Sequence, residues 1–220
     1  MAFLVKTDIL TTWYLELQTK FLRNFNERLL NEEEREHGKQ TWVYDKIHIV
    51  SITVDNRAPF VNRHLKALEW GKKYNVYLVK VTRGEHHYIL PKKDFIIHVG
   101  DKIYVMGEKN NILNFYKKID MTPCARMRTM HQFMESGYGD EEHALSVGVV
   151  KIAGHEKFAG KAIKSGRIRE DWNCMIIGIQ REGYPVVMPN ANRLISKGDI
   201  LWIVGSNNNI GRLMGQYIEK

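Results

Sequence analysis

The hydrophobic positions of the chain fall into short alternating runs separated by polar turns. Residues 61–70 carry Val61, Leu65 and Leu68 at helical spacing, and a second helical stretch, 110–119, begins with two Asn residues suited to a helix cap. The runs typical of β-strands are 46–54, 76–83, 86–90 and 101–107. Together these patterns predict the element order β-α-β-β-β-α.

The same order returns from residue 145 onward. The stretch RGEHHYILPKKDFIIHVGDKIYVMGEKNNI begins at Arg83, and REGYPVVMPNANRLISKGDILWIVGSNNNI begins at Arg181, 98 residues later. The Pro, Gly-Asp, Gly and Asn-Asn-Ile positions of the two stretches match without a gap. The second copy predicts strands at 145–152, 174–181, 185–188 and 199–205, with helices at 159–166 and 208–218.

The repeat predicts an α+β fold of two tandem lobes with mixed, mainly antiparallel sheets. Before the first lobe, Asp8 to Glu36 lacks Gly and Pro and carries apolar residues at three- and four-residue steps, which predicts a long amphipathic helix. Pro123 and an acidic SGYGDEE stretch indicate a linker between the lobes. The expected domains are 1–43 (connecting helix), 44–118 (first lobe), 119–144 (linker) and 145–220 (second lobe).

The repeated residues have structural explanations. Pro91 and Pro189 end a strand because proline lacks the N–H donor of the ladder. In Gly100-Asp101 and Gly198-Asp199, glycine tolerates positive φ and the Asp side chain satisfies nearby backbone N–H groups. We therefore assign these positions to the shape of the lobes and not to chemistry.

Net charge separates the lobes from the connecting segments. The chain carries +8 in total, with +7 in residues 44–118 and +5 in residues 145–220, while residues 1–43 carry −1 and residues 119–144 carry −3. A basic surface serves nucleic acid, an anionic membrane face or a phosphorylated ligand, or is simply solvated.

Candidate catalytic and metal-binding groups form no coherent set. The two cysteines, Cys124 and Cys174, have no paired spacing, which suits a reducing compartment. The scattered histidines lack the spacing of metal ligands, and the acidic run Asp140 to Glu142 resembles hydrated surface. No nucleophile, carboxylate pair or metal set is repeated, so we expect neither an enzyme nor a metal protein. The apolar run at residues 2–5 is too short to span a bilayer, so we expect the chain as given to be soluble, either alone or as part of a larger protein.

The repeated pattern resembles the C-terminal lobe of the RCK domain, the regulator of potassium conductance, which is also called the TrkA-C domain. It consists of a strand, a short helix, an apolar strand ending in Arg, a Pro eight residues later, Gly-Asp, an apolar strand, Gly and a final helix. The likeness covers residues 45–118 and 145–218. The stretch KFLRNFNERLL within residues 1–43 also resembles the segment that follows the last membrane helix of bacterial monovalent cation:proton antiporters.

The resemblance implies a cytoplasmic, dimerising ligand sensor attached to a potassium channel, transporter or antiporter, at the inner face of the cell membrane. The membrane transport domain would stand in the same or a separate chain. NAD is not expected, because no G-x-G-x-x-G loop lies between a strand and a helix. No cofactor is expected, although some relatives bind cyclic di-AMP.

Those relatives use a Leu/Ile-Arg step before the second strand and an Asn near the start of that strand. Ile168-Arg169 match the first feature, while Met175 stands where Asn is sought, and the first lobe has Trp70-Gly71 and Tyr77 instead. The predicted site for a small anionic ligand is therefore Ile168 and Arg169, together with Arg167 because of its charge.

The resulting interpretation is a regulatory module that controls potassium or sodium/proton transport. The alternative is a nucleic-acid-binding protein that uses the basic surface. The strand aromatics fall into apolar runs that predict burial, and no RNA- or DNA-binding signature is present, so we expect no nucleic acid partner.

Overall fold

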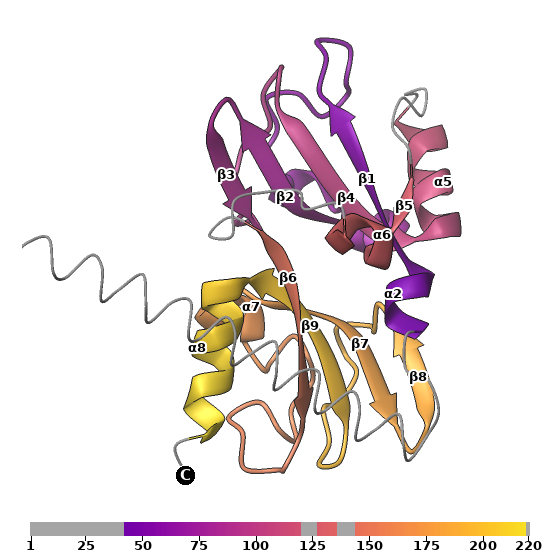
Figure 1. The fold of residues 1–220 in the computed structure, drawn as a ribbon. Helices are drawn as coiled ribbons and strands as arrows, with labels where there is room; N and C mark the ends of the chain where they lie inside the picture. Colours follow the sequence, from indigo (N-terminus) through magenta and orange to yellow (C-terminus); the bar gives the residue numbers. More distant parts are fainter. Residues whose placement is uncertain (1–41, 120–126, 136–143, 219–220) are drawn as a thin grey trace, which may run out of the picture.

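The computed structural model describes residues 42–119, 127–135 and 144–218. They form two lobes, one above the other in Figure 1, and the chain passes from the first to the second between β5 (Arg128–Thr129) and β6 (Leu145–Lys151). The amphipathic helix expected over Asp8–Glu36 lies outside the described residues. Within these residues, no helix is both long and apolar enough to cross a membrane.

The first lobe follows the order that the sequence predicts. Its elements are β1 (Ile47–Thr53), α3 (Leu65–Leu68), α4 (Trp70–Tyr74), β2 (Tyr77–Arg83), β3 (His86–Ile89), β4 (Lys102–Glu108) and α5 (Lys109–Lys118). A short helix, α2 (Trp42–Lys46), precedes it. The strand β5 (Arg128–Thr129) comes from the expected linker and pairs with β1, which gives the sheet order β3-β2-β4-β1-β5.

The second lobe repeats this arrangement. Its elements are β6 (Leu145–Lys151), α7 (Ile168–Trp172), β7 (Met175–Arg181), β8 (Tyr184–Val187), β9 (Ile200–Ser206) and α8 (Asn207–Ile218). The sheet order is β6-β9-β7-β8. All pairs between these strands and between those of the first lobe are antiparallel. The α+β class with two tandem lobes is confirmed.

The helix predicted at 159–166 is wrong in position. Turns and one isolated bridge, between Ala162 and Leu194, occupy this segment, and α7 begins only at Ile168. Gly160 has a φ of 75° and Arg167 a φ of 56°, both in the left-handed region that interrupts a right-handed helix. The apolar residues Ala159 and Ile163 of the segment instead pack against the second-lobe core.

The molecule has three hydrophobic clusters. One lies within the first lobe and packs α4 and α5 against one face of the sheet, and a second does the same for α7 and α8 in the second lobe. The third contains residues of both sheets, including Ile49 and Met106 from the first and Ile177 and Val204 from the second. The lobes therefore share a core across their junction.

This shared core explains why the two central strands are nearly all apolar. In β4, Ile103 and Val105 face the first-lobe cluster, whereas Tyr104 and Met106 face the junction. The strand β9 alternates in the same way. A strand buried on both faces shows no alternation between apolar and polar residues, although its neighbours are antiparallel.

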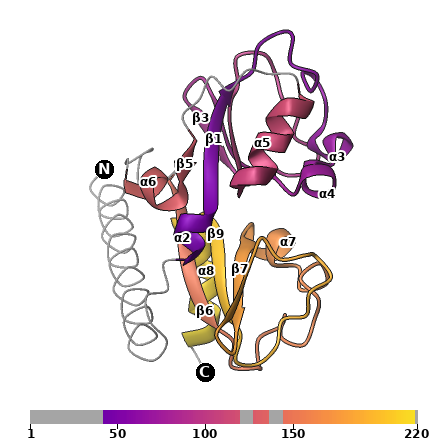
Figure 2. The same ribbon diagram turned by 90° about the vertical axis from the view of Figure 1, so that its right-hand side faces the viewer.

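Two short helices cross over at the junction, and Figure 2 shows α2 and α6 (Met130–Glu135) on the same side of it. Trp42 of α2, which precedes the first lobe, packs against Trp202 of the second lobe, with ring centroids 4.8 Å apart. Phe133 of α6, which precedes the second lobe, packs against Tyr104 of the first, at 5.9 Å. Tyr104 and Trp202 occupy equivalent repeat positions, so each short helix covers the lobe that it does not lead into.

The Gly-Asp turns have the predicted form and one further partner. Gly100 and Gly198 have φ values of 87° and 88°. Asp101 accepts a hydrogen bond from the backbone N–H of His98 at 2.9 Å, as Asp199 does from Ser196 at 2.8 Å. In addition, Arg83 and Arg181 each donate two side-chain hydrogen bonds to these carboxylates, which are fully buried. The Arg that ends β2 and β7 thus fixes the turn before the next strand.

Candidate functional site

A cavity of about 970 Å³ opens where the two lobes meet. The first lobe contributes residues from α3 and from the segment after β3, and the second contributes residues from α7. Figure 2 shows α3, α4 and α7 on the side of the molecule opposite α2 and α6. The lining residues are His64, Lys66, Ala67, Leu90, Lys92, Lys93, Asp94, Arg169, Glu170 and Asn173. We call this cavity the junction cleft.

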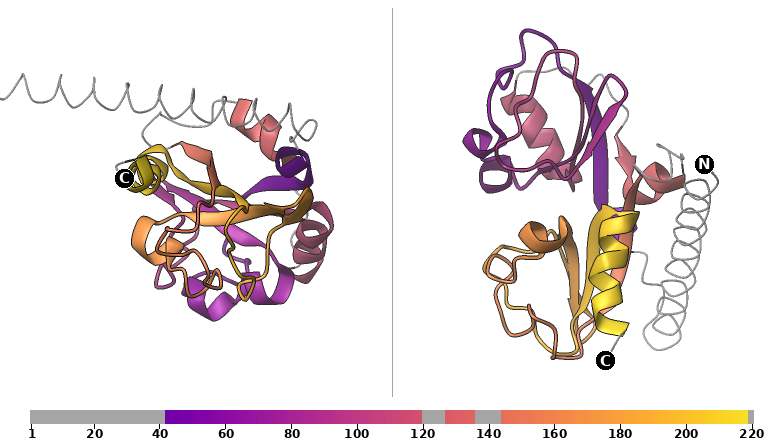
Figure 3. Two further views of the ribbon diagram at one scale, coloured as in Figure 1. Left: turned by 90° about the horizontal axis from the view of Figure 1, so that it is seen from below. Right: turned by 90° about the vertical axis from the view of Figure 1, so that its left-hand side faces the viewer.

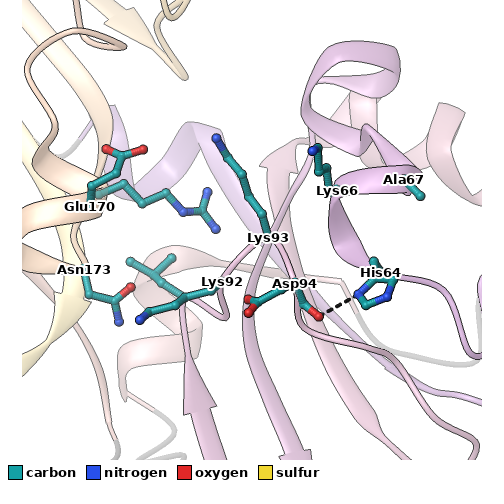
Figure 4. Close-up of a pocket in the computed structure, with 10 residues that line it drawn as sticks. His64, Lys66, Ala67, Lys92, Lys93, Asp94, Glu170 and Asn173 are labelled. Carbon is teal, nitrogen blue, oxygen red and sulfur yellow. Dashed lines mark hydrogen bonds between the residues drawn. The ribbon is translucent and has the colours of Figure 1, made fainter.

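The junction cleft is basic. Four of its residues are cationic at neutral pH, namely Lys66, Lys92, Lys93 and Arg169, against two carboxylates, Asp94 and Glu170. Figure 4 shows Lys92 extending toward Asn173, and Lys93 reaching between Glu170 and Lys66. Converging cations around a concave surface favour an anionic ligand.

Two smaller pockets adjoin the junction cleft and are repeat equivalents of each other. The first, about 320 Å³, lies against the first lobe and is lined by Leu65, Trp70 and Pro91, among others. The second, about 250 Å³, is lined by the equivalent residues Ile163, Ile168 and Pro189. Tyr77, Lys93 and Arg169 line both. The two lobes therefore present similar apolar pockets around a common set of polar groups.

Arg169 occupies the centre of this arrangement. Its Nη2 donates a hydrogen bond to the carbonyl oxygen of Pro91 in the other lobe, at 3.3 Å. Within the described residues, it forms no ion pair. Burial lowers the pKa of its guanidinium, an effect that the negative charge of Glu170 opposes. The remaining N–H donors of this partly desolvated cation are available to a ligand.

Other contacts hold the lobes around the cleft. The side-chain amide of Asn173, at the end of α7, donates to the carbonyl oxygen of Ile89 in β3, at 3.1 Å. The equivalent residue in the first lobe, Asn75, instead accepts a hydrogen bond from the Tyr77 hydroxyl, at 3.2 Å. On the far side of the cleft, His64 Nδ1 donates to the carbonyl oxygen of Asp94, at 2.8 Å (Figure 4).

In the first lobe, a side chain at the position equivalent to Arg169 would displace the ring of Tyr77. The equivalent position is Gly71, where an added Cβ would lie 2.9 Å from Cε1 of Tyr77. The Tyr77 ring thus fills the space that a side chain at position 71 would need. Burial raises the pKa of the Tyr77 hydroxyl, which the positive charge of Arg169 partly offsets.

The three predicted ligand residues have different environments. Arg169 lines the junction cleft and both smaller pockets. Ile168 is 3% exposed and packs in the second-lobe core, where it forms part of the wall of the second smaller pocket. Arg167 is exposed and pairs with Asp171, at 3.1 Å. A ligand contact by any of the three stays a prediction.

Sequence reasoning missed the first-lobe side of the cleft. Lys92 and Lys93 follow the repeated Pro91, and the equivalent residues after Pro189 are Asn190 and Ala191. This difference between otherwise matching copies was a usable signal, because shape-determining positions are shared and these are not. The contact between Arg169 and Pro91 was not predicted, because the two residues are 78 positions apart in sequence and meet only in the fold.

Among the other candidate groups of the sequence analysis, Cys174 lies in the described part of the chain. Cys174 is buried, and burial raises the pKa of its thiol to about 12, so it carries no thiolate at neutral pH. Cys124 and Asp140–Glu142 lie outside the described residues. Among residues 42–119, 127–135 and 144–218, no cluster of three or more His, Cys, Asp or Glu could hold a metal ion.

Comparison with known proteins identifies the repeated unit. The TrkA-C domain model matches residues 49–120 and again residues 148–215. An uncharacterized transporter of Synechocystis is 20% identical over 161 residues, which are 73% of this chain but only 26% of the relative. The chain thus spans about a quarter of the length of this curated relative.

Several solved structures are similar at low identity. The RCK C domain of the potassium transport protein KtrA, in complex with cyclic di-AMP, is 20% identical, with 40% of this chain and 89% of that chain covered and a TM-score of 0.30. The GsuK RCK domain is 9% identical, with coverages of 80% and 64% and a TM-score of 0.36. The RCK_C dimer of Streptococcus agalactiae BusR, also with cyclic di-AMP, is 23% identical, with coverages of 33% and 89% and a TM-score of 0.30.

The two matches of the family model together cover more than half of the chain. They begin and end close to the limits of the two sheets and their final helices. The chain belongs to the TrkA-C domain family, whose domain it contains twice in tandem.

Proposed function

We propose that this protein is a cytoplasmic regulatory module that binds a small anionic ligand at the junction of its two lobes and thereby controls monovalent cation transport. The observation that supports this proposal is the junction cleft. It is basic, both lobes line it, and a hydrogen bond from Arg169 to the opposite lobe crosses it.

The cleft is well placed for regulation because its walls belong to different lobes. A ligand that contacts both walls prefers one relative orientation of the lobes and stabilises it by its difference in affinity. The helix α2 lies at the same junction and follows residues 1–41 in sequence. A change in the relative orientation of the lobes can therefore be transmitted through α2 to the part of the protein that precedes it. We propose a membrane transport domain for potassium or sodium/proton exchange, in the same or a separate chain, with the module acting as a homodimer at the inner membrane face.

The proposed ligand is an anionic nucleotide such as cyclic di-AMP, and no catalytic step is proposed. Two similar apolar pockets flanking a cationic centre suit a molecule with two flat rings and a phosphate-bearing middle.

Calorimetric titration of the full 220-residue chain tests ligand binding. The probes are cyclic di-AMP, AMP, ATP and NADH at fixed salt. We expect one of the phosphate-bearing probes to bind, and Arg169→Ala to weaken its binding by about tenfold or more, because a charged hydrogen-bond donor is lost. The exposed Arg212→Ala, which removes the same charge from α8, serves as the control.

Transport is tested with the natural protein in everted membrane vesicles. We expect the binding probe to change the rate of potassium- or sodium-dependent proton exchange in the wild type and to have no effect in Arg169→Ala. Absence of binding by every probe would contradict the sensing role, whereas binding without any effect on exchange would contradict the link to transport.

A further inference from the structure

The two sides of the junction cleft differ in charge. Three cations, Lys92, Lys93 and Arg169, face one another across the junction, two from the first lobe and one from the second. Their repeat equivalents are Asn190, Ala191 and Gly71, all neutral. At each of these three positions, a cation in one lobe therefore corresponds to a neutral residue in the other lobe.

The packing around Gly71 in the first lobe also differs from the packing around Arg169 in the second. Gly71 has no room for a side chain while Tyr77 occupies its present position, at 2.9 Å from a Cβ at residue 71. In the second lobe, Met175 replaces Tyr77, and Arg169 is accommodated beside it. A long flexible methionine yields space that a rigid ring does not. The glycine at position 71 and the tyrosine at position 77 are thus linked by packing.

We infer that the chain binds a single anionic group, a phosphate or a group of similar size and charge, on the side of Lys92, Lys93 and Arg169. On the equivalent side the three matching positions are neutral, and Lys164, the equivalent of Lys66, is the lining cation among the described residues. This inference rests on the proposed sensing function and specifies its ligand. The ligand is held asymmetrically, by one phosphoryl group, with its bases along the apolar pockets. A two-fold symmetric arrangement of the ligand, with matching anionic contacts to each lobe, does not fit these residues.

The charge balance of the cleft supports this assignment. In the described residues, Lys92 and Lys93 form no ion pair, and Arg169 has only its hydrogen bond to Pro91. Glu170 lies close enough to raise the pKa of Arg169 but does not pair with it. An incoming phosphoryl group supplies the negative charge that the cleft lacks, with charge-assisted hydrogen bonds to Arg169 and the two lysines.

The test exchanges residues between the repeats. The variant Lys92→Asn/Lys93→Ala gives the first lobe the residues of the second, and Lys117→Asn/Lys118→Ala makes the same changes on the exposed face of α5 as a matched control. Calorimetry with AMP and cyclic di-AMP is expected to give one equivalent per chain for the wild type. The cleft variant should bind about tenfold more weakly or worse, and the control should bind as the wild type does.

A further measurement addresses the asymmetry itself. We expect AMP to bind within about tenfold of cyclic di-AMP, since only one phosphoryl group is recognised. The quadruple variant Gly71→Arg/Tyr77→Met/Asn190→Lys/Ala191→Lys recreates the cationic side in the other half, and it should bind inorganic phosphate with a second equivalent. Circular dichroism and thermal unfolding establish that each variant is folded.

The outcomes separate the two proposals. If none of the four probes, cyclic di-AMP, AMP, ATP and NADH, binds the wild type, the sensing function fails and this inference fails with it. If a nucleotide binds but its affinity is unchanged in Lys92→Asn/Lys93→Ala, or if wild-type binding saturates at two equivalents per chain, the single-anion site is wrong while the sensing function stands. Failure of the quadruple variant to gain a phosphate equivalent, when it is folded, also contradicts the assignment of these residues.

Discussion

The two lobes are alike in their Gly-Asp turns but differ at the junction between them. In both lobes, an arginine, a glycine with positive φ and a buried aspartate form the same turn, and the Arg Nε to Asp Oδ1 distance is 2.7 Å in each. At the junction, Tyr104 and Phe133 stand on one side, whereas Trp202 and Trp42 stand on the other. The residues of these turns are shared, whereas the aromatic residues that meet across the junction differ.

Fusion of the repeats into one chain explains this contrast. In a symmetric homodimer, one substitution alters both halves of the interface. In a tandem chain, each side of the junction changes independently, while each lobe must still fold by its own turns. The junction is therefore the region where this chain has acquired differences, and the following variants test that comparison.

The largest expected effect is at Trp202, which is fully buried at the junction. We expect Trp202→Ala to lower the free energy of unfolding by about 4 kcal/mol, because it leaves a cavity beside Trp42 and removes the ring contact. Trp202→Tyr introduces the residue of the first lobe and should cost about half as much. Urea unfolding measures both, and an absence of any loss in Trp202→Tyr would show that the shape of the indole is unimportant here.

The turns should respond alike in the two lobes. We expect Asp101→Asn and Asp199→Asn each to lower the free energy of unfolding by about 3 kcal/mol. Each substitution removes the buried negative charge with which the arginine of the turn forms its two hydrogen bonds. Thermal unfolding of the two variants at the same pH measures this. A difference of more than about 1 kcal/mol between them would show that the shared sequence does not confer shared stability.

The Asp101 turn also predicts a pH dependence. Burial by itself raises the pKa of Asp101, but the hydrogen bonds from Arg83 and the backbone of His98 outweigh it, so the pKa lies below the usual value. A carboxyl whose pKa is lower when folded stabilises the protein above its unfolded pKa of about 4 and loses this contribution in acid. The stability difference between wild type and Asp101→Asn should therefore shrink as the pH falls below about 4. A difference that stays constant down to the acid limit of folding would contradict the charged pair.

The smallest expected effect is at Gly71. Gly71→Ala should cost about 1 kcal/mol, because its Cβ displaces the Tyr77 ring. Combining it with Tyr77→Met, which copies the second lobe at position 77, should restore most of that loss. Unfolding curves of the single and double variants provide the coupling energy. If the losses of the two single variants simply add up in the double variant, the two positions do not interact.

The order of elements could be predicted from the sequence because the gapless repeat gives two independent views of one pattern. The helix predicted at 159–166 was wrong. The apolar residues of this segment have near-helical spacing, but Gly160 and the left-handed Arg167 determine the backbone. The Arg83–Asp101 pair depends on two positions meeting beside a turn, and spacing alone does not reveal it. Arg169 was predicted from family resemblance, whereas Lys92 and Lys93 belong to the site only because the lobes pack in one particular orientation.

The crossing of the short helices also determines how a mechanical load enters the molecule. Figure 3 shows the two lobes and α6 from two further directions. Trp42 and Val43 pack against Gly178 and Trp202, and the Trp42 indole donates a hydrogen bond to Gln180, at 3.2 Å. Tension on the chain ahead of residue 42 therefore pulls first on the second repeat, although the first repeat follows next in sequence. A pulling force from the preceding chain therefore loads the junction between the lobes before it extends either lobe.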